Sequence, residues 1–262
     1  MSAGTNKKIR LETYTRREFR EALQAEQFKV AILATGSIEQ HLEHLAFSQD
    51  IQSSTYVAER VAERLYPNVV VSVPISIGIA EHHMHFPGTM SAKPGSWLSV
   101  LFDAIESLVR HGITKILILN GHGGNVAPVK GVLEQWKLHL TSVYGNPISG
   151  NLKESIETHN DYTNALLNRD SAGMDLRFNS YWDLIPSDFA ENVMESDNYP
   201  GHAGEFETSI AMEIFPGNVE EDAIQYNNDI ESSSAAAEKG RLLIEKAIDG
   251  TTALVTEMLS GI

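Results

Sequence analysis

The stretch that most constrains this chain runs from Thr114 to Asn125 and reads TKILILNGHGGN. Segment 115–119 has the length of a strand, and every residue in it after Lys115 is apolar. Such a run is typical of a strand in a parallel sheet that is covered by helices on both faces. The run stops at His122 and three glycines, and glycine permits positive φ angles and close backbone approaches. Because ligands of open α/β sheets bind beyond the carboxyl ends of strands, we expect His122 at a ligand site. The structural alternative is a glycine-rich turn whose histidine caps the next helix.

The composition excludes several classes of protein. A chain of 262 residues is long enough to bury a substantial core. Its net charge of −15 argues against a nucleic-acid partner, and no apolar run approaches the length of a membrane span. Because the chain has no cysteine, histidine and carboxylate side chains must hold any metal. We therefore expect a cytoplasmic enzyme without a membrane partner.

Hydrophobic spacing predicts strands and helices that alternate along most of the chain. Strands are expected at 28–35, 69–73, 115–119 and 176–185, and helices at 15–25, 50–66, 94–111, 127–140, 210–214 and 232–259. Segment 141–175 is polar, with a weak helix possible at 153–167, and the alternation does not require it. We interpret it as an insertion in a single domain 1–262, either a lid or an oligomerisation arm. This order of elements is typical of an α/β fold.

Polar side chains follow the first predicted strand. Glu39 and His41 are two residues apart, so their side chains point the same way in an extended loop. A carboxylate and an imidazole that converge beyond a strand end suit a divalent metal ion. On spacing alone, Asp50 is as readily a helix N-cap as a metal ligand.

Two later segments carry further candidate side chains. His82, His83 and His85 form a histidine tract, and such tracts bind metal, although one or two of the three are expected to be merely exposed. Glu205 and Glu207 lie near the N-terminus of a predicted helix. The helix dipole favours carboxylates at that position whether or not they have a function.

Together these stretches resemble the signature of the creatininase family of metal-dependent amidohydrolases. The segments that carry the resemblance, in family order, are GSIEQH with a following aspartate, HFPGT, NGHGGN and HAGEFETS. They span most of the chain apart from the insertion and the termini. The resemblance implies a three-layer α/β/α sandwich with a mainly parallel sheet, a centre of two divalent ions (Zn, Mn or Fe) and a homo-oligomer, usually a hexamer.

The resemblance also implies roles for individual residues. Glu39, Asp50 and His122 would hold one metal ion. His41 and Asp50 would hold the other, so that Asp50 bridges the two ions. Two divalent ions roughly 3.5–4 Å apart can share a hydroxide and polarise a carbonyl oxygen together.

The HAGE segment would complete this site. The last metal ligand is expected from this segment and is assigned to Glu205, which is also taken as a catalytic carboxylate. Glu207 is expected to support the substrate nearby, or to be the ligand itself in the other register. His202 would act as the general acid that gives a proton to the leaving nitrogen. The backbone N–H groups of Gly123 and Gly124 would help to bind the oxyanion of the substrate.

The expected substrate-binding residues differ from those of a creatinine-hydrolysing enzyme. That enzyme has a tyrosine after the histidine of its NGH motif, where this chain has Gly123. It also has a Trp-Asp pair before its later histidine segment, where this chain has NYPG at 198–201. Trp182 matches an aromatic residue that gates the pocket, and His82, His83 and His85 offer polar contacts. We therefore expect a small-molecule substrate, a cyclic or formyl amide other than creatinine.

Two alternatives stay open. The same metal centre would also suit hydrolysis of a carbon–carbon bond beside a ketone, which opens an oxidised inositol or sugar-like ring and releases no amine. An alternative of another class is a non-catalytic metal-binding assembly protein. It is disfavoured because every expected ligand position in the sequence is filled.

Overall fold

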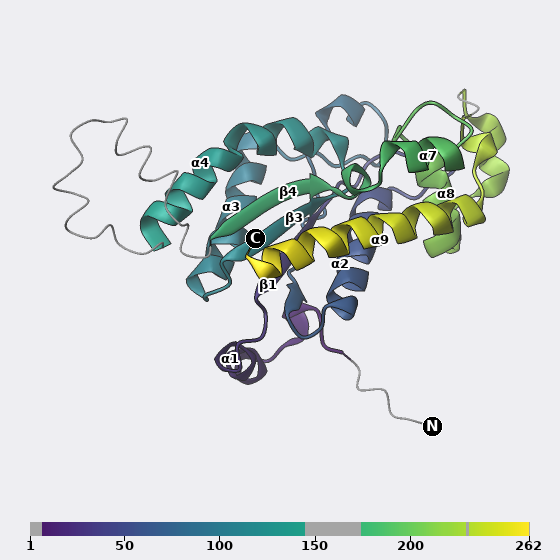
Figure 1. Cartoon of the computed structure of the whole chain (residues 1–262). Helices are drawn as coiled ribbons and strands as arrows, with labels where there is room; N and C mark the ends of the chain where they lie inside the picture. Colours follow the sequence, from purple (N-terminus) through teal and green to yellow (C-terminus); the bar gives the residue numbers. More distant parts are fainter. Residues whose placement is uncertain (1–6, 145–173, 229–230, 262) are drawn as a thin grey trace.

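A parallel sheet forms the centre of the molecule (Figure 1). The computed structural model describes residues 7–144, 174–228 and 231–261. Within them the sheet has the strand order β2-β1-β3-β4, and every neighbouring pair is parallel. The strands are β1 (Val30–Thr35), β2 (Val69–Val71), β3 (Lys115–Asn120) and β4 (Asp175–Ser180).

Helices precede the first strand, connect the strands and follow the last one. They are α1 (Arg16–Gln24), α2 (Gln49–Arg64), α3 (Pro94–Arg110), α4 (Val126–Tyr144), α7 (Ser187–Val193), α8 (Glu205–Ile214) and α9 (Ala237–Ser260). The predicted insertion at 141–175 lies almost entirely outside the described residues, as does the weak helix expected at 153–167. Within the described residues, α4 continues to Tyr144 and β4 begins at Asp175.

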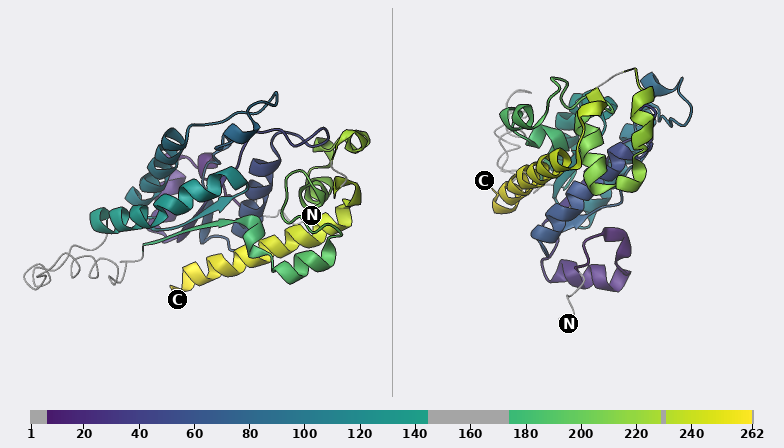
Figure 2. Two further views of the ribbon diagram at one scale, coloured as in Figure 1. Left: turned by 90° about the horizontal axis from the view of Figure 1, so that it is seen from above. Right: turned by 90° about the vertical axis from the view of Figure 1, so that its right-hand side faces the viewer.

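The helices form one layer on each face of the sheet. All six residues of β1 are buried, and alternate side chains enter opposite hydrophobic clusters. Val30, Ile32 and Ala34 pack with α2, α8 and α9, whereas Ala31 and Leu33 pack with α1, α3 and α4. The views in Figure 2 show the sheet between α4 on one side and α9 on the other. The predicted α/β/α sandwich is therefore confirmed, as is the burial of the central strands on both faces.

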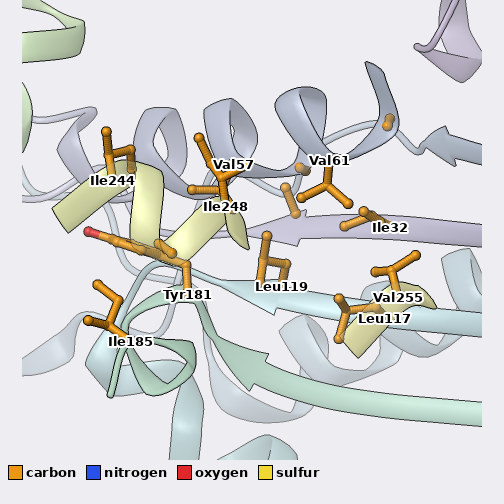
Figure 3. Close-up of a cluster of buried hydrophobic side chains, with 14 of the residues drawn as sticks. Ile32, Val57, Val61, Leu117, Leu119, Tyr181, Ile185, Ile244, Ile248 and Val255 are labelled. Carbon is orange, nitrogen blue, oxygen red and sulfur yellow. The ribbon is translucent and has the colours of Figure 1, made fainter. Parts of the chain in front are cut away.

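Figure 3 shows the cluster on the α9 side of the sheet. Ile32 of β1 and Leu119 of β3 meet Val57 of α2 and Ile248 of α9 in one buried group. Tyr181, which follows β4, is fully enclosed in the same group. This packing holds α2 against the sheet, and the first turn of α2 carries Asp50.

The predicted strand at 176–185 is too long at its carboxyl end. β4 ends at Ser180, and a 3₁₀ helix, η4 (Tyr181–Leu184), follows. The side chains of Ser180 and Asp183 form a capping box with each other's backbone N–H groups, which starts the helical turn. The turn places Tyr181 in the core and the neighbouring Trp182 beside the cavity described below.

Across the described ranges, no helix combines the length and the apolar character needed to cross a lipid bilayer.

Gly240 provides a test of how α8 and α9 pack. A Cβ at this position would overlap the backbone carbonyl of Ser209 in α8. We expect Gly240→Ala to lower the free energy of unfolding by roughly 1–3 kcal/mol, because the two helix backbones must move apart. The measurement is chemical denaturation followed by circular dichroism.

Gly131→Ala is the matched control. Gly131 lies in α4, and a Cβ there meets no atom of the described residues within 4 Å. Alanine favours a helix over glycine by about 0.5–1 kcal/mol, so this variant should be as stable as the wild type or more so. Equal destabilisation of both variants would contradict the close packing of α8 on α9.

Candidate metal centre

A buried polar network joins the carboxyl ends of three strands. Thr35 at the end of β1 donates from Oγ1 to Asn120 Oδ1 at 3.1 Å. Asn120 at the end of β3 donates from Nδ2 to Ser180 Oγ of β4 at 3.1 Å. Asn125 donates to the same Asn120 Oδ1 at 3.1 Å and to the carbonyl oxygen of Gly36 at 3.1 Å. These bonds fix the starting points of the loops that carry the predicted site residues.

Two glycines after the strands allow α2 to approach the sheet edge closely. A Cβ at Gly121 would overlap the carbonyl oxygen of Asp50, and one at Gly36 would overlap the backbone of Ile51. Neither glycine has a positive φ angle, so close approach, and not a left-handed backbone, requires glycine here. The first turn of α2 therefore lies against both loops. Its N-cap is Ser48, so Asp50 is not the N-cap that spacing alone allowed.

Glu39, Asp50 and His122 form one buried group at this edge. His122 Nδ1 lies 3.2 Å from Glu39 Oε2 and 3.0 Å from Asp50 Oδ2. Both carboxylate oxygens are buried without a hydrogen-bond partner among the described residues. Unpartnered buried carboxylate oxygens that converge with an imidazole nitrogen are what a divalent cation requires.

His41 and Glu207 form a second group on the other side of Asp50. His41 Nε2 lies 3.0 Å from Asp50 Oδ1 and 3.7 Å from Glu207 Oε2. Asp50 thus directs one carboxylate oxygen to each group. The structure brings together four of the five predicted metal ligands, Glu39, His41, Asp50 and His122.

Hydrogen bonds to backbone carbonyl groups orient the rings of His41 and His122, so that one nitrogen of each ring faces the carboxylates. His41 Nδ1 lies 3.1 Å from the carbonyl oxygen of Glu39, and His122 Nε2 lies 3.1 Å from the carbonyl oxygen of Ile79. A carbonyl oxygen only accepts, so each of these nitrogens carries hydrogen and donates it. The opposite nitrogens, His41 Nε2 and His122 Nδ1, are left to bind a cation, as in most histidine–metal sites. The residues present therefore fit a metal centre.

The electrostatics of the site favour positive charge. Burial lowers the pKa of His41, but the Asp50 and Glu207 carboxylates outweigh it and raise that pKa to about 9. Burial likewise opposes a charge on His122, yet the nearby carboxylates of Asp50 and Glu39 outweigh it and raise the pKa of His122 to about 10. Burial raises the pKa of Glu207 to about 7. Metal binding would displace the protons that these groups otherwise hold.

The assignment of Glu205 as metal ligand and catalytic carboxylate is wrong in this structure. Glu205 is buried away from the cluster, with Oε1 2.6 Å from Lys239 Nζ. Its Oε2 accepts hydrogen bonds from the backbone N–H groups of Glu195 and Ser196 at 2.9 and 2.7 Å. Residues two apart on an α-helix project about 200° apart, so only one of Glu205 and Glu207 can face the site. The structure places Glu207 there.

A cavity of about 290 Å³ opens onto both clusters of side chains, the one formed by Glu39, Asp50 and His122 and the one that contains Glu207. Of the predicted substrate-binding and catalytic residues, His83, Gly123, Trp182, His202 and Glu207 line it. His202 Nδ1 lies 3.8 Å from Glu39 Oε1, and His83 Nε2 lies 3.6 Å from the same oxygen. Burial lowers the pKa of His202 to about 4, with a further contribution from nearby His41. His202 is therefore a neutral imidazole near neutral pH.

His85 does not belong to this cavity. Its exposed ring packs on Phe86 with a centroid separation of 4.2 Å, so the structure does not support its predicted substrate contact. His82, another member of the predicted histidine tract, lines the cavity and stacks on His122. A short 3₁₀ helix, η2 (Glu81–His83), sets this orientation, and the spacing of the histidines alone did not reveal it.

Gln40 is a further residue that the sequence analysis missed. Its side chain lies behind two histidines of the cavity, with Nε2 2.9 Å from His83 Nδ1 and 2.9 Å from His202 Nε2. Its position between Glu39 and His41 was the available signal.

Comparison with known proteins identifies the family. The family model described as "Creatininase: Creatinine amidohydrolase" matches residues 12–234. The chain belongs to the creatininase family. Members of the creatininase family are hydrolases, and this protein is therefore a hydrolase of that family.

Curated relatives of this creatininase-family protein have different named activities. It is 26% identical over 206 residues to creatinine amidohydrolase of Pseudomonas putida, which covers 74% of this chain and 68% of that protein. It is 27% identical over 157 residues to mycofactocin precursor peptide peptidase of Mycobacterium ulcerans, covering 54% and 62%. It is 32% identical over 116 residues to 3-dehydro-scyllo-inosose hydrolase of Thermotoga maritima, covering 44% and 36%. The chain thus spans less than two thirds of the last two relatives.

Solved structures of creatininases share the fold. One described as "Creatininase Mn" has a TM-score of 0.72 and 22% identity, covering 96% of this chain and 98% of that chain. A mutant creatininase described as "Zn-Zn type" has the same TM-score, identity and coverage. Among the described residues of this chain, groups of histidine and carboxylate side chains lie close enough together to hold a metal ion. The homo-oligomer, its hexameric size and the cytoplasmic location stay predictions.

The two glutamates of α8 can be separated by metal content. We expect Glu207→Gln to lower the affinity for zinc by more than roughly 10–100-fold, the usual effect of losing an outer-shell partner. Glu205→Gln should keep the wild-type zinc content, because Glu205 contacts Lys239 and backbone N–H groups instead of the cluster. Equilibrium dialysis followed by elemental analysis measures both. Loss of zinc from the Glu205 variant alone would reverse the assignment.

Proposed function

We propose that this protein is a two-metal hydrolase of a small cyclic or formyl amide, and that creatinine is not its substrate. The observation that carries this proposal is the shared position of Asp50. One of its oxygens faces His122 and the other faces His41, each at 3.0 Å. A single carboxylate between two imidazole–carboxylate groups is the arrangement that a pair of bridged cations needs.

The ligand sets follow from these contacts. Glu39, Asp50 and His122 would hold one ion, and His41, Asp50 and Glu207 the other. Nitrogen and oxygen ligands of this kind accept zinc, manganese or iron. Ions bound there would supply the Lewis acidity that polarises a carbonyl group and activates water at neutral pH.

The protein side chains then bind and orient the substrate. His83 and His202 line the cavity beside Oε1 of Glu39, whereas His122 lies beside Oε2. His202 stays our predicted proton donor to the leaving nitrogen. That role requires hydrogen on Nδ1, because Nδ1 is the nitrogen that points to the carboxylates while Nε2 contacts Gln40.

The cavity supports a small substrate other than creatinine. Its volume of about 290 Å³ is at the lower end for ligand pockets. Gly123 forms its wall without a side chain, and Pro200 and Gly201 precede His202 there. Tyr199 donates its hydroxyl hydrogen to the Trp182 carbonyl at 2.6 Å, which directs that hydroxyl away from any ligand. The aromatic and acidic clamp expected for creatinine is therefore missing from these lining positions.

A second candidate is hydrolysis of a carbon–carbon bond beside a ketone in a carbocyclic, sugar-like ring. The 32% identity over 116 residues to an inosose hydrolase favours it. The same cluster and cavity would serve, because both reactions begin with attack of water on a carbonyl carbon. The products differ, since only amide hydrolysis releases an amine.

The test is a substrate screen of metal-reconstituted protein. Lactams, formamides, inosose-type ketones and creatinine are offered to the zinc- and manganese-loaded forms. We expect turnover of an amide with release of an amine, and no turnover of creatinine. Ring opening of a ketone without amine release would select the second candidate.

Asp50→Asn tests whether the activity depends on the shared carboxylate. Because loss of an outer-shell partner already costs roughly 10–100-fold, loss of the bridging ligand should lower kcat/KM by more than 100-fold and reduce metal content. Asp103→Asn, on the exposed face of α3, is the control and should change neither quantity. An Asp50 variant that keeps both ions and full activity would show that the bridging assignment is wrong.

A further inference from the structure

The four histidines around Glu39 fall into two pairs according to what lies behind each ring. The outer nitrogens of His41 and His122 face carbonyl oxygens, which only accept hydrogen bonds. The outer nitrogens of His83 and His202 both face Nε2 of Gln40 at 2.9 Å. An amide nitrogen only donates hydrogen bonds. The two pairs are therefore held in opposite hydrogen-bonding states.

The orientation of the Gln40 amide is fixed from its other end. The backbone N–H of Leu42 donates to Gln40 Oε1 at 2.9 Å, so Oε1 and Nε2 cannot exchange places without losing that bond. Leu42 has a φ angle of 56°, a left-handed conformation that is unfavourable for leucine. Such a backbone persists only where the surrounding contacts hold it in place. The Gln40 side chain is also buried, which limits exchange with water.

From these contacts we infer that Gln40 is a positioning residue that fixes the tautomers of His83 and His202. The NH₂ group gives one hydrogen to His83 Nδ1 and one to His202 Nε2, so both nitrogens must carry lone pairs. In the neutral rings the hydrogen then resides on the opposite nitrogens, His83 Nε2 and His202 Nδ1. These two N–H groups face the cavity.

Glu39 favours the same tautomers from the other side. The inward nitrogens of His83 and His202 lie 3.6 and 3.8 Å from Glu39 Oε1. Hydrogen on these nitrogens faces a carboxylate oxygen favourably, whereas lone pairs there would repel it. The donor behind the rings and the acceptor in front of them act in the same direction.

One consequence concerns metal binding. On distance alone, His202 belongs to two groups able to hold an ion, one with Glu39 and His83 and the other with His41 and Glu207. A histidine ligand must present a lone pair, and Gln40 keeps hydrogen on both inward nitrogens. Gln40 therefore separates the ligand histidines, His41 and His122, from a pair that stays free of metal.

The other consequence concerns the substrate, and it rests on the proposed hydrolase function. The two rings stack with a centroid separation of 4.5 Å, so their N–H groups point into the cavity side by side. Paired donors recognise oxygen acceptors, such as a carbonyl or hydroxyl group next to the bond that is cleaved. A charged His202 would turn an N–H toward the Gln40 NH₂ group, which disfavours imidazolium. In the resting site His202 is therefore a neutral hydrogen-bond donor at Nδ1, and it would give a proton as a general acid only after the Gln40 amide had turned away from Nε2.

The tautomers can be measured directly on the zinc-loaded full-length protein labelled with ¹⁵N-histidine. Two-bond ¹H–¹⁵N correlation spectra distinguish Nδ1–H from Nε2–H rings. We expect Nδ1–H for His202 and Nε2–H for His83, assigned with the His202→Gln and His83→Gln variants. Gln40→Met, of similar size but without the donor, should remove this preference. The opposite tautomers in the wild type, or unchanged tautomers in Gln40→Met, would overturn the inference.

Gln40→Glu is the complementary variant. A carboxylate keeps the acceptor for the Leu42 N–H but replaces the donor with a second acceptor, so the inward nitrogens should become lone pairs. We expect it to bind one additional zinc ion per chain in equilibrium dialysis, and Gln40→Glu combined with His83→Asn should lose that ion. Zinc content equal to the wild type would contradict the metal-exclusion role. The tautomer and zinc measurements both test the positioning role of Gln40, even if the substrate screen finds no amide hydrolysis.

Discussion

Buried negative charge at the carboxyl edge of the sheet is the constraint on which the functional region depends. Glu39, Asp50 and Glu207 are almost fully removed from water, and a buried carboxylate is stable only when it is paired. Imidazolium groups or divalent ions provide the compensating positive charge. The elements that carry these side chains must therefore hold them within reach of one cationic centre, although Glu207 lies far along the chain from Glu39 and Asp50.

Backbone packing, more than side-chain contact, produces that convergence. Glycines at the ends of β1 and β3 let the first turn of α2 lie against both loops, which brings Asp50 between His41 and His122. The two glutamates in the first turn of α8 have different roles. Glu205 joins α8 to α9 through Lys239, and Glu207 faces the centre. Glu205, which resembles a metal ligand in sequence, thus supports Glu207, which contacts the site.

The sequence predicted the parts that depend on periodicity and on the order of motifs. The buried strands follow from apolar runs that end in polar loops, whereas the sandwich and the meeting of Glu39, His41, Asp50 and His122 were implied by the resemblance to the creatininase family. The choice between Glu205 and Glu207 could not be made, because it depends on where α8 begins and hence on the rotation of each side chain. For a similar reason the sequence could not tell which histidines of the tract line the cavity, and the structure places His82 and His83 there but not His85. The role of Gln40 depends on hydrogen positions in folded rings, which no spacing reveals.

The amide and hydroxyl network at the strand ends has a broader consequence. Thr35, Asn120, Asn125 and Ser180 satisfy one another without any ion, so the scaffold is complete before a cofactor arrives. Folding and cofactor acquisition become separate events, unlike those of a zinc finger, which collapses only around its ion. Such a protein can bind its metal ions long after it has folded, and the kind of ion that it binds can change with the supply of divalent ions.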